Sequence, residues 1–345
     1  MAISQIESVG LGSTAQYPGF KNRIINGDMR IDQRNAGAAV TPGTSVSLYV
    51  VDRWYTVTSA NTGSKVTVQQ NAGSVTPPAG FSNYLGYTNI SAYTPTGLDQ
   101  LSLRQTIEGV NASDLGWGTV NAQPTTLSFV VRSSLTGTFS GSIYNSSANR
   151  VYVFSFSIFT ANTWEYKMIT IPGDTTGTWL TNNSAGLTIQ FNLGNGPSFL
   201  SSSTGWGSTY YAGLTGSQSP GAVSGATFYI TGVQLEKGSV ATSFDFRSVG
   251  QELALCQRYY AVVSGFSGYG YFSGGLASLI TTVPLPVTMR AAPTVTITSS
   301  GAITAGYSTA VYGASGLSAF SYQVISNAAG TGGSLLASAT AAIEL

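Results

Sequence analysis

One stretch decides the fold of this chain: Ala226-Thr-Phe-Tyr-Ile-Thr-Gly-Val-Gln-Leu-Glu-Lys237. Phe228 and Ile230 alternate with polar or aromatic neighbours, which is typical of a strand with one buried face. Beyond these two residues the apolar positions shift by one, to Val233 and Leu235. A one-residue slip would turn the buried set to the wrong face, so we expect a β-bulge at residues 231–232.

A short helix is predicted over residues 248–260, after a corner that follows this strand. Ser248 stands three residues before Gln251, which is the spacing of a capping box. Apolar residues then recur at helical intervals of four, three and four: Val249, Leu253, Cys256 and Tyr260. A helix of about three turns is unstable alone. Its stripe must pack on the sandwich or on copies of itself, and we expect it to form an oligomer interface.

The composition favours an all-β protein whose surfaces are shared in an assembly. Gly is abundant, with 42 residues, whereas charged residues make up only 8% and the net charge is +1. This balance indicates neither a nucleic-acid partner nor an anionic membrane. Charges gather in residues 21–53, whereas Arg290 and Glu344 are the only ones after residue 259. A surface with so few charges is expected where sister chains cover part of it.

Several kinds of chemistry lack their usual residues. The chain has no His, so the commonest general base and metal ligand are missing, and we expect no cofactor. Cys256 is the single cysteine, which excludes an intrachain disulfide and a cysteine metal cluster. The N-terminus lacks a basic-then-apolar signal, and no apolar run reaches about 18 residues. We therefore expect synthesis in a cytoplasm and no insertion into a membrane.

Alternating apolar residues predict a two-sheet sandwich over residues 21–247. The clearest alternating sets are Leu127, Phe129 and Val131; Phe154, Phe156 and Ile158; and Leu187, Ile189, Phe191 and Leu193. Residues 261–345 predict a smaller β-sandwich domain with short strands around Val295 and Phe320. The stretch 283–287 contains two prolines, so it is expected to be an edge strand or a connector.

Seven segments of the chain belong together: Ile24-Ile-Asn-Gly-Asp28, Val51-Asp-Arg-Trp-Tyr55, Leu103-Arg-Gln-Thr-Ile-Glu-Gly-Val110, Leu127-Ser-Phe-Val-Val-Arg132, Thr163-Trp-Glu-Tyr-Lys-Met-Ile-Thr-Ile-Pro-Gly173, Tyr229-Ile-Thr-Gly-Val-Gln-Leu-Glu236 and Arg247-Ser-Val-Gly-Gln-Glu-Leu-Ala-Leu-Cys-Gln-Arg-Tyr-Tyr260. Together they resemble phage tail-fibre and virion-surface proteins that begin with a carbohydrate-binding-like jelly-roll domain. The resemblance covers about residues 20–330. It implies an N-terminal jelly-roll β-sandwich, a connecting helix and a terminal β-domain.

The resemblance also implies a function and partners. We expect a non-enzymatic virion appendage, such as a tail fibre, that recognises a host surface glycan or protein. A homotrimer is expected, attached to other virion proteins by the N-terminal arm of residues 1–20. Its docking residues are expected to be apolar: Ile3, Ile6, Val9 and Leu11. The alternatives are a capsid or tail decoration protein that binds only virion proteins, and a depolymerase of surface polysaccharide.

Aromatic residues in glycine-rich stretches are the candidates for contact with a receptor or ligand. One set lies between two confident strands, in residues 195–225: Trp206, Tyr210 and Tyr211. The other lies in the C-terminal domain: Tyr269, Tyr271 and Phe272. Covering the core, or meeting another subunit, is the alternative role of these aromatic residues.

Carboxylates leave glycosidase chemistry formally open, because it needs only two of them at the right separation. The pairs that could be proposed are Asp28 with Asp32, and Glu165 with Asp174. We expect Asp28 and Asp52 instead to be structural groups near arginines. Calcium requires 6 to 8 oxygen ligands, and the sequence holds no acidic loop of that density.

Overall fold

The computed structural model describes residues 20–273, 277–303, 307–312, 316–326 and 329–345. The chain divides into two compact units, residues 1–246 with Leu345 and residues 247–344. The proposed docking residues lie outside the described part of the chain: Ile3, Ile6, Val9 and Leu11.

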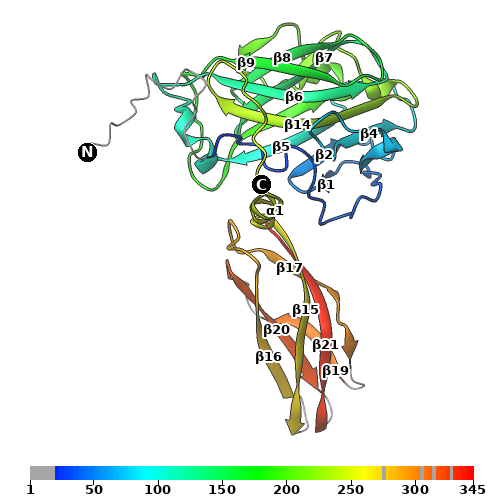
Figure 1. Ribbon diagram of the computed structural model, residues 1–345, viewed down its shortest axis with the longest axis vertical. Coiled ribbons are helices and arrows are strands. Elements are labelled where there is room, and N and C mark those ends of the chain that lie inside the picture. The colour runs from blue at the N-terminus through cyan, green and yellow to red at the C-terminus, as the bar shows by residue number, and fades with distance from the viewer. Residues whose placement is uncertain (1–19, 274–276, 304–306, 313–315, 327–328) are drawn as a thin grey trace, which may run out of the picture. The chain divides into compact units, whose positions relative to one another are not determined.

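The first unit is a β-sandwich of two large antiparallel sheets (Figure 1). The seven-stranded sheet has the order β1 (Ser47–Val51), β2 (Trp54–Thr58), β5 (Leu101–Glu108), β10 (Ala185–Asn192), β7 (Gly137–Asn145), β8 (Val151–Ile158) and β12 (Gly205–Gly207). The five-stranded sheet has the order β3 (Val66–Gln70), β4 (Leu85–Asn89), β14 (Thr227–Lys237), β6 (Thr125–Ser133) and β9 (Glu165–Ile171). A two-stranded parallel ladder joins β11 (Leu200–Ser201) to β13 (Gly213–Leu214).

Five 3₁₀ turns lie in the connections of this unit. They are η1 (Ala72–Ser74), η2 (Gly109–Asn111), η3 (Ser113–Leu115), η4 (Pro197–Phe199) and η5 (Pro220–Ala222). Both η4 and η5 begin with a proline, whose missing N–H costs nothing at the start of a helical turn.

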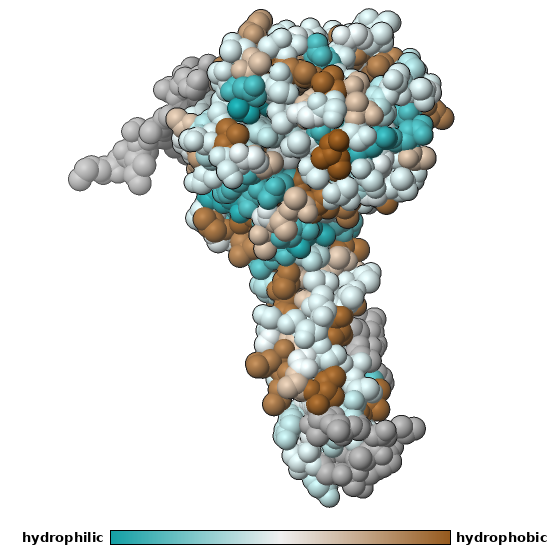
Figure 2. All heavy atoms as spheres, turned by 90° about the vertical axis from the view of Figure 1, so that its right-hand side faces the viewer, coloured by the Kyte–Doolittle hydropathy of each residue, from teal (hydrophilic) through white to brown (hydrophobic). Residues whose placement is uncertain are grey.

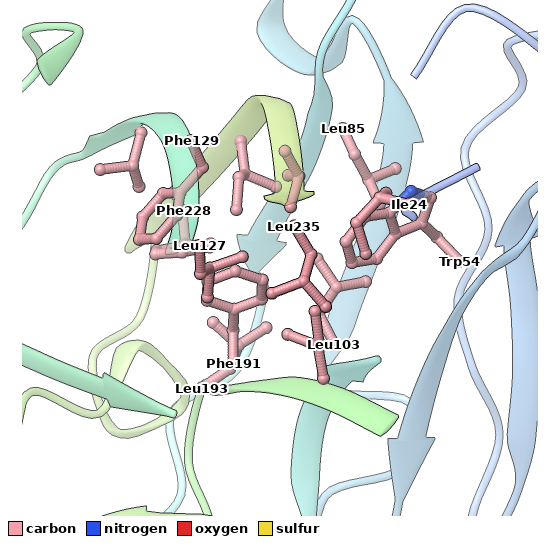
Figure 3. Packing of buried hydrophobic residues seen from close by; sticks show 14 of the residues in the cluster. Ile24, Trp54, Leu85, Leu103, Leu127, Phe129, Phe191, Leu193, Phe228 and Leu235 are labelled. Atoms are coloured by element: carbon pink, nitrogen blue, oxygen red, sulfur yellow. The ribbon is translucent and has the colours of Figure 1, made fainter. Parts of the chain in front are cut away.

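The core fills the space between the two large sheets. Leu127 and Phe129 from β6 and Phe228 from β14 lie in one cluster with Leu103 from β5 and Phe191 from β10 (Figure 3). The rings of Phe129 and Phe191 meet edge to face with centroids 5.2 Å apart. The alternating apolar residues of these strands are therefore the residues that join the sheets, as predicted.

The predicted β-bulge in β14 is confirmed. The register between β14 and β6 shifts between Thr231 and Gln234, and Gly232 has φ = 61°. A Cβ on Gly232 would lie 2.6 Å from the ring of Phe81. Glycine is therefore required here both by the left-handed backbone and by the neighbouring ring.

The predicted helix is present as α1 (Val249–Gln257) in the second unit. Its capping box is confirmed, because the Ser248 side chain accepts from the backbone N–H of Gln251 and the Gln251 side chain accepts from the backbone N–H of Ser248. The prediction that Tyr260 lies on this helix is wrong. Tyr260 begins strand β15 and pairs with Ala342, so strand pairing ends the helix early.

The second unit consists of two further antiparallel sheets. One has the order β15 (Tyr260–Ser273), β21 (Ala329–Ala342) and β17 (Thr294–Ser299), and β18 (Ala302–Ile303) also pairs with β21. The other has the order β16 (Ala277–Pro284), β20 (Ala319–Ser326) and β19 (Tyr307–Tyr312). The proline-containing stretch ends β16 at the edge of its sheet, as expected.

The core of this unit is small. Phe320, Tyr322 and Val324 of β20 lie in one cluster with three alanines of β21. In Figure 2, the visible surface of the second unit is mostly near-neutral or hydrophobic, with few hydrophilic residues.

The predicted all-β class, with one short helix and a smaller C-terminal β unit, is confirmed by the order of the described elements. Among the described helices, none is long and apolar enough to cross a membrane.

Candidate functional site

The outer face of the seven-stranded sheet carries polar and aromatic side chains in two rows that cross the strands. The first row joins register partners on β2, β5, β10 and β7: Tyr55, Arg104, Gln190 and Ser142. The second row joins register partners on β5, β10 and β7: Thr106, Thr188 and Tyr144. Their neighbours along each strand point into the core, since successive side chains of a strand point to opposite faces.

Arg104 is the centre of this face. Its Nη2 donates to Gln100 Oε1 at 2.8 Å and to the hydroxyl of Tyr210 at 2.9 Å. Its Nη1 reaches the hydroxyl of Tyr144 at 3.5 Å. Tyr210 in turn donates to Gln190 Oε1 at 3.0 Å. We call these residues, together with the neighbouring Tyr55, the Arg104 cluster.

Three side chains of the cluster are largely buried. Tyr55, Arg104 and Tyr144 each keep 9% of their surface exposed. Burial raises the pKa of Tyr144, and the charge of Arg104 lowers it by less, so the phenol stays neutral at physiological pH. A neutral phenol can both donate and accept a hydrogen bond, so the cluster presents hydroxyls beside one positive charge.

Further aromatic and polar groups extend the face around the cluster. The ring of Tyr49 lies 5.1 Å from that of Tyr55, and the guanidinium of Arg34 lies 4.8 Å from the Tyr49 ring centre. The hydroxyl of Tyr55 shares a hydrogen bond of 3.0 Å with Thr106. The face therefore continues as aromatic rings and hydroxyls onto β1.

Residues 195–225 are not the structureless loop that their composition indicates. They contain three short strands and two 3₁₀ turns. Tyr210 and Tyr211 pack against Tyr144, Val151 and Val153, so this segment covers the β7–β8 side of the outer face. Tyr210 thereby joins the Arg104 cluster, while the Tyr211 side chain packs against the covered side.

Trp206 lies elsewhere, in a group of three tryptophans that packs against the core. Its ring lies 5.4 Å from that of Trp117 and 5.8 Å from that of Trp179. Its indole N–H donates to the carbonyl of Pro172. The indole N–H groups of Trp117 and Trp179 are likewise bonded within the protein. A small pocket opens beside Trp117 and Trp179, but its lining is mainly apolar.

The remaining sequence candidates belong to the second unit. Tyr269 and Tyr271 lie on β15 and are 50% and 76% exposed. Phe272 is in the same strand, and its side chain lies outside the described part of the structure.

The four residues of the proposed oligomer interface differ in burial. Cys256 is buried, Val249 is exposed, and Leu253 and Tyr260 are half-buried. The helical stripe is therefore not covered as a whole within the unit. A role for it between subunits stays a prediction.

The carboxylates that could be proposed for catalysis are held in structural contacts. Burial by itself raises the pKa of Asp174, but bonds from Arg150 and Thr176 outweigh it and lower the pKa below the usual range. Lys167 and two backbone N–H groups likewise outweigh burial and lower the pKa of Glu165. A lowered pKa disfavours the role of general acid, which needs a raised one.

Asp28 and Asp52 also have structural partners. Asp28 forms an ion pair with Arg30, and Asp52 accepts a bond of 3.1 Å from the backbone N–H of Gln33. Within the described residues, no group of three or more acidic or cysteine side chains is placed to hold a metal ion.

Sequence reasoning identified Tyr210 and missed the rest of the Arg104 cluster. Arg104 follows Leu103 in an alternating strand, which was sufficient to place it on the outer face. Nothing local indicated that Tyr55, Tyr144 and Gln190 lie beside it, because they come from three other strands. An isolated arginine on a strand with few other charges was the one available signal.

The arrangement can bind a polar ligand with flat apolar faces. Tyrosine rings offer such faces with a polar tip, and Arg104, Gln100 and Gln190 offer directional hydrogen bonds.

Comparison with known proteins shows similarity in structure only. No protein-family model and no curated protein sequence matches the chain. It is similar to the enzymatically active domain of tailspike protein 4 of bacteriophage CBA120, with 12% identity and a TM-score of 0.33 over 63% of this chain and 21% of that one. The chain thus spans about a fifth of the length of that tailspike chain.

Carbohydrate-binding modules are similar as well. The family 11 module of Clostridium thermocellum, in complex with a β-1,3-1,4-mixed-linked tetrasaccharide, is 14% identical with a TM-score of 0.28, over 59% of this chain and all of that one. The CBM22-1 xylan-binding domain from Paenibacillus barcinonensis is 8% identical with a TM-score of 0.27, over 60% and 99%. At these values the likeness carries no conclusion about ligand or activity, which have to be inferred from the side chains.

Proposed function

We propose that this chain is a non-enzymatic glycan-binding protein of a bacteriophage particle, a tail fibre or similar appendage that recognises the host surface. The observation that carries the glycan-binding part is the Arg104 cluster on the outer face of the seven-stranded sheet. The virion part is supported by the sequence segments that resemble phage tail-fibre proteins.

The chemistry of the cluster fits a sugar better than an apolar ligand. Sugar rings have apolar faces, which pack on aromatic rings, and hydroxyls, which need directional partners. Tyr55, Tyr144 and Tyr210 supply rings, and Arg104 and Gln190 supply donors and acceptors. Four neighbouring strands hold most of these groups, so binding requires little ordering of the protein.

Attachment and assembly complete the proposal. Residues 1–20 would attach the chain to other virion proteins, and the chain would act as a homotrimer. Tyr269 and Tyr271 would offer a second contact for the host surface, since both are well exposed.

A glycan-binding assay on the full chain tests the proposal. The protein is applied to an array of bacterial surface polysaccharides, beside the variants Tyr210→Ala and Tyr166→Ala. Tyr166 is the matched control, because it is 55% exposed and lies on the outer face of the other sheet. We expect wild type and Tyr166→Ala to bind the same glycans and Tyr210→Ala to lose at least tenfold in affinity. Equal binding by all three proteins would show that the Arg104 cluster is not the glycan-binding site.

Two further measurements separate the alternatives. Incubation with a bound polysaccharide should release no reducing ends, and release above background would indicate a depolymerase. Immunogold labelling of phage particles should mark an appendage of the tail. Labels on the capsid, together with no glycan binding, would indicate a decoration protein.

A further inference from the structure

We propose that the ligand of the Arg104 cluster carries a carboxylate, as a uronic acid or a nonulosonic acid such as sialic acid does. This inference rests on the proposed glycan-binding function and names the class of glycan. It follows from the surroundings of the Arg104 guanidinium, which differ from those of the buried Arg23.

Arg104 is a buried charge whose partners are neutral. Among the described residues, its guanidinium contacts an amide oxygen of Gln100 and the phenols of Tyr144 and Tyr210. Arg23 is similarly buried, but its Nη2 lies 2.7 Å from a carboxylate oxygen of Asp114. A buried charge is costly unless an opposite charge compensates it. An anionic ligand would supply that compensation at Arg104.

The guanidinium has donors left for such a ligand. Arginine carries five N–H donors, two on each Nη and one on Nε. The Nη2 hydrogens are used by Gln100 and Tyr210, whereas Nη1 makes only the contact of 3.5 Å with Tyr144. Nη1 therefore has capacity for a carboxylate oxygen. Hydrogen bonds between arginine and a carboxylate are charge-assisted and stronger than neutral ones.

The size of the charge favours a carboxylate over a phosphate monoester. A phosphate monoester carries about −1.5 to −2 at pH 7, whereas one guanidinium carries a single positive charge. The cluster itself contains that one cation, and its other members are tyrosines and glutamines; the Arg34 guanidinium lies farther along the face, against the Tyr49 ring. A sugar carboxylate matches both the charge and the flanking rings.

Pairs of oligosaccharides that differ only in the carboxylate test the inference. The probes are tetramers of glucuronate, galacturonate and mannuronate and a sialyl-lactose, each beside its carboxyl-reduced counterpart. Titration calorimetry is run with the full chain, with Arg104→Lys and with Arg104→Gln. We expect at least one acidic probe to bind, its reduced counterpart to bind at least tenfold more weakly, and Arg104→Gln to lose this preference. Arg104→Lys should keep part of the preference because it keeps the charge.

The possible results separate the carboxylate inference from the glycan-binding function. Acidic and reduced members that bind within twofold of each other would refute the carboxylate while leaving glycan binding intact. Binding of neutral polysaccharides on the array, with no acidic probe bound, would do the same. No binding to any probe or array glycan would refute both proposals. If Arg104→Gln fails to fold, the paired probes on the wild-type protein decide the question alone.

Discussion

Arg104 and Arg150 both lie beside aromatic rings in the first unit, yet their partners differ in kind. Arg150 donates from Nε and Nη2 to both carboxylate oxygens of Asp174 at 2.7 Å, and its guanidinium lies 5.7 Å from the Trp206 ring centre. Arg104 is the more buried of the two, at 9% exposed, and its described partners are phenols and amides. The better buried charge is therefore the one without a carboxylate.

This difference separates a structural arginine from a binding one. A two-point ion pair holds the Asp174 segment, which also accepts from the Trp179 indole, against the tryptophan group. A buried guanidinium with neutral partners contributes less to stability than it costs in lost hydration. Groups that break a local rule of stability are expected at functional sites. The following predictions test this distinction between Arg150 and Arg104.

The largest effect is expected from breaking the structural pair. Asp174→Ala leaves the Arg150 guanidinium without its carboxylate and the Trp179 indole without one acceptor. We expect the free energy of unfolding to fall by about 3 kcal/mol. Urea denaturation followed by tryptophan fluorescence measures this. Glycan affinity at a temperature where the variant stays folded should be unchanged, and a loss of affinity would contradict the distinction.

A similar change at Arg104 should act on binding instead. Arg104→Gln removes a charge-assisted donor, and such bonds are worth about 1.5–3 kcal/mol. We expect affinity for the bound glycan to fall by that amount while the free energy of unfolding changes by less than about 1 kcal/mol, as is common when no ion pair is broken. Calorimetric titration and urea denaturation of the same preparation give both values. A fall of several kcal/mol in the free energy of unfolding would instead show that Arg104 is a structural residue.

Acid should weaken the Arg150–Asp174 pair before it affects Arg104. The folded-state pKa of Asp174 lies below its ordinary value of 3.8, so its stabilisation is complete above that value and is lost as pH falls through the folded pKa. We expect the melting temperature of wild type to fall as pH drops below about 4. Asp174→Asn should show a shallower fall across the same range. Equal slopes for the two proteins would contradict a charged pair.

The smallest effect is expected from one hydroxyl. Tyr210→Phe keeps the ring and removes the acceptor for Arg104 and the donor to Gln190. We expect a loss of about 1 kcal/mol in glycan affinity, which is typical of one neutral hydrogen bond. Calorimetric titration beside Tyr211→Phe provides the control, since the Tyr211 side chain packs on the covered part of the sheet. Equal losses in both variants would assign the effect to packing.

Local patterns predicted the features that depend on neighbours in the chain. The alternation around Phe129 and Phe191 predicted the core faces of β6 and β10, and Ser248 with Gln251 predicted the start of α1. The end of that helix was predicted wrongly. Tyr260 continues the helical spacing, but its partner Ala342 lies far along the chain, and pairing with it forms a strand.

The sequence by itself determined the all-β class, the bulge at Gly232, the capped helix and the absence of histidine chemistry. The tertiary structure alone decided which polar residues meet. Arg104 lies 106 positions from Tyr210 and 40 from Tyr144. The strand order β5-β10-β7 brings Tyr144 near Arg104, and the segment 195–225, packed over β7 and β8, brings Tyr210. The physical reason is that alternation specifies the face of a strand on which a residue lies, whereas its neighbours across the sheet depend on long-range pairing and register.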